Sequence, residues 1–360
     1  MIIKVSDEII ENCIIIACSF HEENRSGLKL YEFDTSNKGF ELLIQENLPF
    51  NPIYIALSQN RQFLYSACSH LRKSGFVSVH EIDLEKRTLT LINTQNSGGL
   101  VPCYVSLDLT NRYLLAANYS SGSFRCFPIL DNGGLGSSIQ TVHHYGQSVH
   151  PERQTEPHIH CILTDPTNYF VYTADLGADQ IVTYTFNSNT GGIKKIHDGV
   201  TSLPPGSGPR HLYFHPRQSW VYLITELSNR IHCYKLDDES ILIETQQSNT
   251  IPESQKSESF AADIIIDPLG LFLYASNRGH DSISIFSISQ IDGTLNYLTT
   301  KSAGGKYPWS LDINSTGNFL IVANKHSNNM VLFQRNLENG MLSKIAELLG
   351  VSNTVAAKFC

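Results

Sequence analysis

The stretch PCYVSLDLTNRYLLAANYSSGSFRCFPI, residues 102–129, contains three short strand patterns separated by turns. Residues 104–107 and 113–117 are compact and mostly apolar, and residues 124–127 alternate around Arg125. A Gly-Gly pair at 133–134 precedes a weaker fourth strand pattern. Short runs rich in aromatic and β-branched residues, broken by Asn, Gly and Pro, are typical of antiparallel strands. The stretch therefore predicts a four-stranded antiparallel meander.

The same pattern recurs along the whole chain. Two clear copies are PRHLYFHPRQSWVYLITELSNRIHCYKL, from Pro209, and PWSLDINSTGNFLIVANKHSNNMVLFQR, from Pro308. Similar units begin near Pro52, Ile159 and Ala261. A four-stranded unit that repeats every forty to about fifty residues is typical of β-propellers. No stretch has a convincing helical period, so we predict an all-β fold.

The two ends of the chain supply one further unit. Residues 13–18, CIIIAC, resemble a second strand that lacks a first strand. Residues 353–359, NTVAAKF, resemble a first strand with nothing after it. Pairing the two ends would close the ring and remove two exposed sheet edges. We therefore predict a single domain over residues 1–360, a seven-bladed β-propeller with four antiparallel strands per blade; two β-sandwiches are the alternative.

The composition narrows the choice of partners and location. A formal charge of −8 is unfavourable for a nucleic-acid or anionic-membrane surface, so neither partner is expected. No apolar run approaches a membrane-spanning length. The N-terminal MIIKVSDEIIENC places acidic residues before its short apolar run, unlike a signal peptide. Eight scattered cysteines without a CxxC pair favour buried reduced thiols and a cytoplasmic location. We expect a monomer or a weak homo-oligomer.

Equivalent positions of the repeats differ where packing alone would make them similar. The first strand of a blade is innermost, so the residue after its initial proline, or after the residue equivalent to that proline, is expected at the central channel. In successive units these residues are Ile53, Cys103, His160, Arg210, Ala262 and Trp309. At the end of the second strand, on the same face, we align Cys68, Asn118, Asp175, Glu226, Asn277 and Asn324, with Arg278 and Lys325 directly after the last two. Charged groups that converge on a concave site are typical of active sites.

Each of these residues also has a structural interpretation. Asp175 is of a type that bonds turn backbone, and Arg210 with Glu226 could form a structural ion pair. His158 and His160 share a strand face and could ligate a metal ion if a third ligand lay nearby. The clustering of both with His211 instead favours at least one histidine in the site. The sequence has no GxGxxG, Walker or GxSxG motif, and we expect neither a cofactor nor a metal.

At these residues the chain resembles the lactonase family of seven-bladed β-propellers, which includes propeller-type 6-phosphogluconolactonases and carboxy-muconate cyclases. The resemblance covers essentially the whole chain and implies a site of one histidine, two arginines and one glutamate: His160 or His158, Arg210, Arg278 and Glu226. Trp309 departs from the family pattern, in which a cation often follows the proline, and leaves the substrate open. The matching segments are PHIHCILTDPTNYFVYTADLGADQI from Pro157, GSGPRHLYFHP from Gly206, ITEL ending at Leu227, AADIIIDPLGLFLYASNRGHDSISIF from Ala261, and PWSLDINSTGNFLIVANKHSN from Pro308.

The resemblance implies hydrolysis of a small anionic lactone, with 6-phospho-D-glucono-1,5-lactone as the expected substrate. Hydrolysis needs a base for water and cations for the developing oxyanion. We expect Glu226 to be the base, provided that no arginine neutralises it, with His160 as an exchangeable base or acid. Arg210 and Arg278 would hold anionic oxygens. The further substrate-binding candidates are His158, His211, Asp175 and Lys325. A cycloisomerase of muconate type and a non-catalytic binding propeller are the alternatives.

Overall fold

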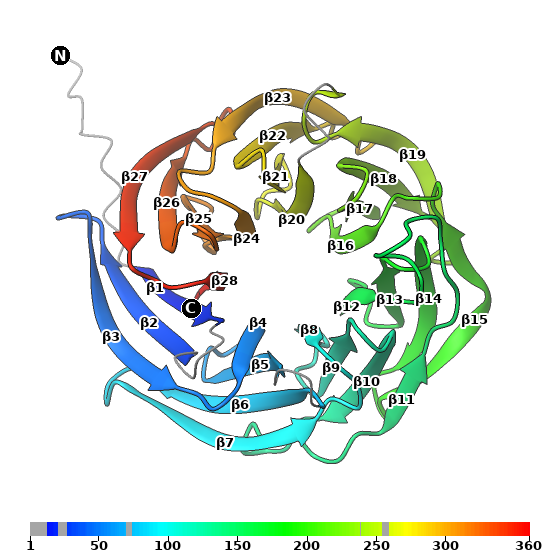
Figure 1. Cartoon of the computed structure of the whole chain (residues 1–360), viewed down its shortest axis with the longest axis horizontal. Coiled ribbons are helices and arrows are strands. Elements are labelled where there is room, and N and C mark those ends of the chain that lie inside the picture. The colour runs from blue at the N-terminus through cyan, green and yellow to red at the C-terminus, as the bar shows by residue number, and fades with distance from the viewer. Residues whose placement is uncertain (1–12, 21–26, 70–73, 238, 254–258) are drawn as a thin grey trace.

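Seven four-stranded antiparallel sheets form a ring around a central opening in the computed structural model (Figure 1). The structure describes residues 13–20, 27–69, 74–237, 239–253 and 259–360, and no α-helix occurs among them. This architecture confirms the predicted all-β, seven-bladed propeller. The N-terminal residues 1–12, for which a signal peptide was not expected, lie outside the described residues.

Each sheet starts at the channel and runs outward, in the same strand order in every blade. The strands, from the innermost to the outermost of each blade, are β28 (Thr354–Phe359), β1 (Cys13–Ser19), β2 (Gly27–Asp34) and β3 (Gly39–Asn47); β4 (Asn51–Leu57), β5 (Phe63–Ser69), β6 (Phe76–Asp83) and β7 (Thr88–Asn96); β8 (Pro102–Leu107), β9 (Tyr113–Asn118), β10 (Ser123–Pro128) and β11 (Gln140–His143); β12 (Ile159–Thr164), β13 (Phe170–Asp175), β14 (Gln180–Asn187) and β15 (Gly192–Ser202); β16 (Pro209–Phe214), β17 (Trp220–Thr225), β18 (Arg230–Leu236) and β19 (Leu242–Asn249); β20 (Phe260–Ile266), β21 (Phe272–Arg278), β22 (Ser282–Ile288) and β23 (Leu295–Ser302); and β24 (Pro308–Ile313), β25 (Phe319–Asn324), β26 (Asn329–Arg335) and β27 (Leu342–Leu349).

The ring closes as the sequence predicts. The C-terminal strand β28 pairs antiparallel with β1, with Ile15 opposite Phe359 and Ala17 opposite Ala357. Figure 1 shows the red β28 next to the blue β1 on the inner side of that blade. Because β28 satisfies the inner edge of β1, the first and last parts of the chain are held in one sheet, and neither presents an open edge there.

The apolar core lies between blades. Seven clusters of buried side chains each combine residues of two adjacent sheets, because every sheet is apolar on both faces. Tyrosines of the second strands add hydrogen bonds to the next blade: Tyr65 donates to the carbonyl of Gly133 at 2.8 Å, and Tyr222 to that of Gly293 at 2.7 Å. These contacts make a rigid ring on which side chains at the channel mouth can be held in place.

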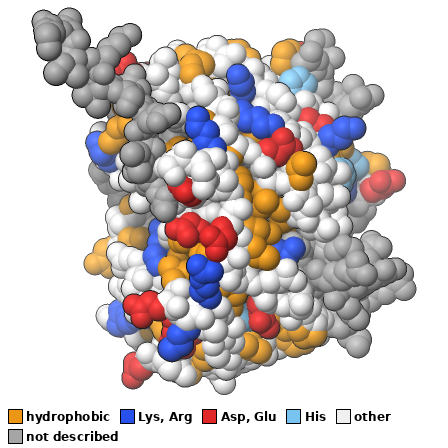
Figure 2. Space-filling model, turned by 90° about the vertical axis from the view of Figure 1, so that its left-hand side faces the viewer, with side chains coloured by type: hydrophobic (Ala, Val, Ile, Leu, Met, Phe, Trp, Pro, Cys, Tyr) orange, Lys and Arg blue, Asp and Glu red, His pale blue; other side chains and the backbone are white. Residues whose placement is uncertain are grey.

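The outer surface carries charges of both signs. In the side view of Figure 2, Lys and Arg side chains alternate with Asp and Glu around a band of hydrophobic side chains. Among the described residues, no helix is long and apolar enough to cross a membrane. All eight cysteines lie in described parts of the chain, and seven of them are buried.

His80 on β6 is a buried histidine at a position where five other blades carry Phe or Tyr. It pairs with Leu64, whereas the equivalent pairs contain Phe127, Tyr184, Tyr234, Phe286 and Phe333. Its side chain is fully buried, and neither ring nitrogen has a hydrogen-bond partner within the described chain. Burial lowers the pKa of His80 to about 4. A buried polar group without a partner costs about 1–3 kcal/mol.

We therefore expect His80→Phe to raise the free energy of unfolding by about 1–3 kcal/mol at neutral pH. The unfolded chain binds a proton near pH 6.5 and the folded chain only near pH 4, so the wild type loses stability between those values as the pH falls. The phenylalanine variant should lose less stability than the wild type over the same pH range. Denaturant unfolding at pH 7, 5.5 and 4.5 checks both statements.

His215 provides the matched control, because it is also buried but has partners for both nitrogens. Its Nε2 lies 2.9 Å from the carbonyl of Gly270, and its Nδ1 accepts a hydrogen bond from the backbone N–H of Arg217. His215→Phe should therefore destabilise the protein. If His215→Phe stabilised the protein, or if His80→Phe destabilised it, the assignment of His80 as an unsatisfied core residue would be contradicted.

Candidate active site at the channel mouth

A β-bulge interrupts the innermost strand of every blade, at the residue beside the channel. In β12, for example, Ile159 pairs with Asp175 and Cys161 with Ala174, so His160 is left unpaired. A bulge redirects a side chain that would otherwise lie on a sheet face. The bulged residues, which we call the bulge ring, are Ile53, Cys103, His160, Arg210, Ala262, Trp309 and Val355. Of the six residues predicted at the channel, all except Ala262 line the cavity described below.

A second ring is formed where the second strands reach the same mouth. Phe260 pairs with Arg278, and the N–H groups of Glu226 and Lys325 bond the equivalent carbonyls of Gly208 and Tyr307. Pro209, in turn, pairs with Thr225 just as Ile159 pairs with Asp175. The sequence alignment of Glu226 with Asp175 is therefore wrong by one residue. Glu226 is equivalent to Tyr119, Arg278 and Lys325. We call these four residues, together with Phe20, the strand-end ring.

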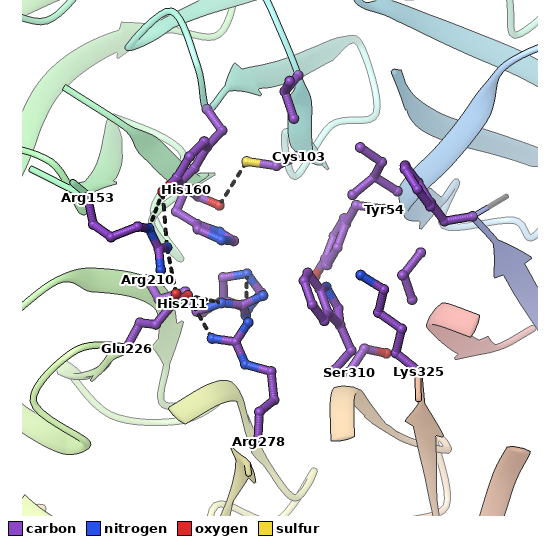
Figure 3. A pocket seen from close by; sticks show the side chains of 16 residues that line it. Tyr54, Cys103, Arg153, His160, Arg210, His211, Glu226, Arg278, Ser310 and Lys325 are labelled. Atoms are coloured by element: carbon purple, nitrogen blue, oxygen red, sulfur yellow. Dashed lines mark hydrogen bonds and ion pairs between the residues drawn. The ribbon is translucent and has the colours of Figure 1, made fainter. Parts of the chain in front are cut away.

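The two rings enclose a cavity of about 330 Å³. Figure 3 shows Arg153, Arg210, Glu226 and Arg278 together on one side, facing Tyr54, Ser310 and Lys325 on the other. The described lining thus has four cations and one carboxylate, although the chain as a whole is negative. The lining residues are Phe20, Ile53, Tyr54, Val101, Cys103, Tyr119, Arg153, His160, Arg210, His211, Glu226, Arg278, Trp309, Ser310, Lys325 and Val355.

Glu226 is bound by three arginines. Its Oε1 lies 2.7 Å from Nη2 of Arg153, and its Oε2 lies 3.1 Å from Nε of Arg210 and 2.8 Å from Nη2 of Arg278. Burial by itself would raise the pKa of Glu226, but Arg278, Arg210 and Arg153 together hold that pKa well below its ordinary value. A carboxylate with so low a pKa and both oxygens engaged is a poor proton acceptor, which argues against Glu226 as the base.

Two of the arginines are fixed deep in the cavity wall. Arg278 donates to the backbone carbonyls of Phe260 and Ala261, both at 3.2 Å, and Arg210 donates to the carbonyl of Ala262. Trp309 faces them, with its ring centre 4.9 Å from the guanidinium carbon of Arg278 and 5.8 Å from that of Arg210. Burial, followed by the nearby Arg278, lowers the pKa of Arg210, but a guanidinium stays charged at neutral pH.

The imidazole of His160 contacts the rings of Tyr119 and His211 edge to face, but one of its nitrogens lacks a hydrogen bond. It is nine-tenths buried, it lines the cavity, and its Nδ1 has no hydrogen bond within the described chain. Burial, then the charges of Arg210 and His211, hold the pKa of His160 well below its ordinary value. The imidazole is therefore neutral at physiological pH. Its Nδ1 is not engaged by another group of the described chain, whereas both oxygens of Glu226 are held by arginines.

His211 supports Arg210 from behind. Its Nδ1 lies 2.8 Å from Oδ1 of Asp263, and its Nε2 lies 3.2 Å from Nη1 of Arg210. Burial and the charge of Arg210 lower the pKa of His211 to about 4, so the contact with Asp263 is a hydrogen bond rather than an ion pair. The Asp263 carboxylate keeps the proton on Nδ1 and leaves Nε2 as an acceptor for the arginine.

Two of the predicted residues do not line the cavity. Oδ1 of Asp175 accepts hydrogen bonds from the backbone N–H groups of His158, Gly177 and Ala178, which favours the structural interpretation weighed above. The ring of His158 stacks on Tyr119 at 4.3 Å, and its Nδ1 lies 2.9 Å from the carbonyl of Tyr119. His158 therefore lies behind Tyr119, and of the two histidines weighed for the site it is His160 that reaches the cavity.

A metal site finds no support at the pair His158 and His160. No group of three or more His, Cys, Asp or Glu side chains is arranged to hold a metal ion anywhere in the described residues. The side chain of His158 is engaged by Tyr119, so the two imidazoles do not share one ligand site. Acid–base and electrostatic chemistry by the side chains themselves is what this arrangement can carry out.

Arg153 is the charged lining residue that sequence reasoning missed. It lies in the connection between β11 and β12, outside the repeated pattern, and reaches Glu226 of the next blade. Comparison of repeats cannot find a residue that has no equivalent in the other blades. Its signal in the sequence was the irregular stretch from His143 to Glu156, which leads directly into the histidine pair.

The chain is similar to known proteins over nearly its whole length. A family model described as "Lactonase, 7-bladed beta-propeller" matches residues 14–359. A Bacillus subtilis protein named 6-phosphogluconolactonase is 34% identical over 92% of this chain and 94% of its own length. A Formosa agariphila protein of the same name is 32% identical, over 91% and 94%. The structure of a Pseudomonas aeruginosa periplasmic gluconolactonase superposes with a TM-score of 0.91 at 25% identity, over 97% of this chain and 99% of the other.

Proposed function

Because the chain belongs to the lactonase family of seven-bladed β-propellers, we propose that it hydrolyses 6-phospho-D-glucono-1,5-lactone to 6-phosphogluconate. The observation that carries this proposal is the neutral His160, whose Nδ1 has no hydrogen bond within the described chain, beside three arginines around the buried Glu226. Such a cavity offers a proton acceptor and a cation cluster in one place, as acyl transfer to water requires. The names of the Bacillus subtilis and Formosa agariphila relatives support the choice of lactone.

In the proposed reaction, His160 removes a proton from water as the water oxygen bonds to the lactone carbonyl carbon. The carbonyl oxygen becomes an oxyanion, which Arg210 or Arg278 stabilises through charge-assisted N–H donors. When the oxyanion collapses, the bond from the carbonyl carbon to the ring oxygen breaks. The protonated His160 returns its proton to that oxygen, so water has been added across the ester bond and the histidine is neutral again.

Glu226 has a different role in this proposal from the one expected from the sequence. Its two oxygens hold three guanidinium groups close together, where they would otherwise repel one another. We assign it the positioning of Arg210 and Arg278, and we assign the base to His160. His211 acts one step further back, by fixing Arg210.

The opposite wall is suited to the carbon skeleton of the substrate. Trp309, Phe20 and Tyr54 offer flat apolar faces, and Nζ of Lys325 lies 4.4 Å from the ring centre of Trp309. A lactone ring has C–H groups on its faces and polar oxygens on its rim, so it can contact the aromatic wall and the cations at once. A volume of about 330 Å³ is near the lower end for small-molecule sites and suits a monosaccharide derivative.

A panel of three substrates tests the proposal and its alternatives. The purified protein should accelerate opening of 6-phosphogluconolactone above its spontaneous rate and act more slowly on unphosphorylated gluconolactone. Turnover of a carboxy-muconate without lactone hydrolysis would favour the cycloisomerase, and inactivity on all three would favour a binding propeller. The cellular location stays a prediction, since the similar Pseudomonas aeruginosa protein is described as periplasmic.

A further inference from the structure

We propose that Arg153 is the specificity-determining residue of the cavity, binding an anionic group at the end of the substrate remote from the reacting carbonyl. This inference rests on the proposed function and adds to it a preference for phosphorylated over uncharged lactones. Its basis is that the three arginines around Glu226 are not equivalent in burial, in partners or in position in the chain.

Arg210 and Arg278 are built into the wall. Their side chains are 1% and 4% exposed, and both donate to backbone carbonyls of β20 as well as to Glu226. Both extend from strands of the rigid ring, one from a bulge and the other from a strand end. Both line the cavity together with His160, beside which the reacting carbonyl is proposed to bind.

Arg153 lies at the mouth instead. Its side chain is 34% exposed, and its partners are two side chains: Glu226, and the hydroxyl of Tyr119 at 3.1 and 3.3 Å. These contacts use Nη2 and Nε, and Nη1 forms no hydrogen bond within the described chain. An Nη1 group that is not engaged, beside a cavity, is suited to donate charge-assisted hydrogen bonds to an oxygen of a phosphate or carboxylate.

The loop that carries Arg153 is fixed on the neighbouring blade. Ser148 donates to Oδ2 of Asp179 at 2.6 Å, and the buried Gln154, next to Arg153, donates to the carbonyl of Leu176 at 2.8 Å. At the start of the loop, His144 bridges Asp175 at 2.7 Å and Tyr184 at 2.8 Å. The position of Arg153 over the cavity is therefore held by side chains that take no part in the reaction.

The charges of the site agree with a second anionic group. Glu226 is the one carboxylate among the described lining residues, and it faces Arg153, Arg210 and Arg278, with Lys325 on the opposite wall. One oxyanion at the buried arginines would still leave the cavity with excess positive charge. A dianionic phosphate at the mouth would balance that excess and would accept hydrogen bonds from Nη1 of Arg153.

The test compares Arg153→Gln with the wild type on two lactones. We expect kcat/KM for 6-phosphogluconolactone to fall about 10- to 100-fold, because a charge-assisted contact is lost, and mainly through KM. The value for unphosphorylated gluconolactone should change less than about threefold. Arg153→Lys should recover part of the loss. Arg217→Gln, an exposed arginine far from the cavity lining, is the matched control and should behave as wild type.

Equal losses on both lactones would overturn the proposal and leave a structural role for Arg153. Binding of inorganic phosphate, measured by calorimetry, separates this outcome from failure of the proposed function. Wild-type protein should bind phosphate about tenfold or more tightly than Arg153→Gln, even if neither lactone is hydrolysed. Equal phosphate affinity in the two folded proteins would also overturn it.

Discussion

Glu226→Gln is expected to lower the free energy of unfolding by about 3–5 kcal/mol at pH 7, the usual cost of removing one partner from a buried charge cluster. The carboxylate is 3% exposed and compensates three arginines, two of which are almost fully buried. Glutamine keeps the shape but leaves those cations uncompensated. Because Arg210 and Arg278 then repel each other, we also expect lactone turnover to fall by at least about 100-fold.

The difference in the free energy of unfolding between wild type and Glu226→Gln should depend on pH in a defined direction. The arginines hold the pKa of Glu226 well below its ordinary value, so its stabilising contribution is fully present above about pH 4.5 and is lost on acidification below it. Urea unfolding at pH 7, 5.5 and 4 measures this. We expect the difference between wild type and variant to be constant from pH 7 to 5.5 and to shrink only below about pH 4.5.

Glu41→Gln is the matched control, since Glu41 pairs with Arg87 at 3.1 Å with both side chains more than half exposed. The same chemical change at this surface pair should cost less than about 1 kcal/mol. Suppose that Glu226→Gln lost as little stability as the control and kept full turnover. The arginine cluster would then neither stabilise the site nor take part in the reaction.

His160→Ala is expected to reduce kcat for 6-phosphogluconolactone by about 100- to 10,000-fold, the usual contribution of a general base. Stability should change by less than about 1 kcal/mol, because the imidazole makes no hydrogen bond through Nδ1 and borders an open cavity. A histidine with only a structural role would give the reverse pattern, with stability lost and turnover kept.

The neighbouring histidine distinguishes the two members of the His-x-His pair. His158→Phe preserves the stacking on Tyr119 and removes the ring nitrogens, so we expect kcat within about threefold of wild type. The pH profile offers a further check. Because the pKa of His160 is held well below its ordinary value, kcat/KM should stay level from pH 8 down through 6.5. A loss of activity with an apparent pKa of 6.5 or higher would contradict the assignment.

The architecture could be predicted from the sequence because it repeats. Strand alternation and turn residues identify each blade, and the unmatched residues 13–18 and 353–359 indicate the closure that the pairing of β28 with β1 confirms. Bulges recur at the same position of each inner strand, so comparing the repeats also found His160, Arg210 and Trp309 at the cavity.

The parts of the site that could not be predicted depend on geometry that has no period. Arg153 lies in a loop without an equivalent in other blades, and its contact with Glu226 joins residues far apart in the chain. The alignment of Glu226 was wrong by one residue, because Thr225 stands where four other blades carry Asp or Asn, and Glu226 was matched with those residues instead. The role of Glu226 as a base was expected only if no arginine neutralised it. The number of arginines that contact it is known only from the three-dimensional structure.

The most direct measurement is the initial rate of 6-phosphogluconolactone opening, with the spontaneous rate subtracted, for wild type and His160→Ala at equal concentrations of folded protein. The account predicts rapid, saturable opening by the wild type and a rate at least about 100-fold lower for the variant. A wild type that does not exceed the spontaneous rate, or a variant as active as the wild type, would contradict the claim that His160 and the arginine cluster form a lactone-hydrolysing site.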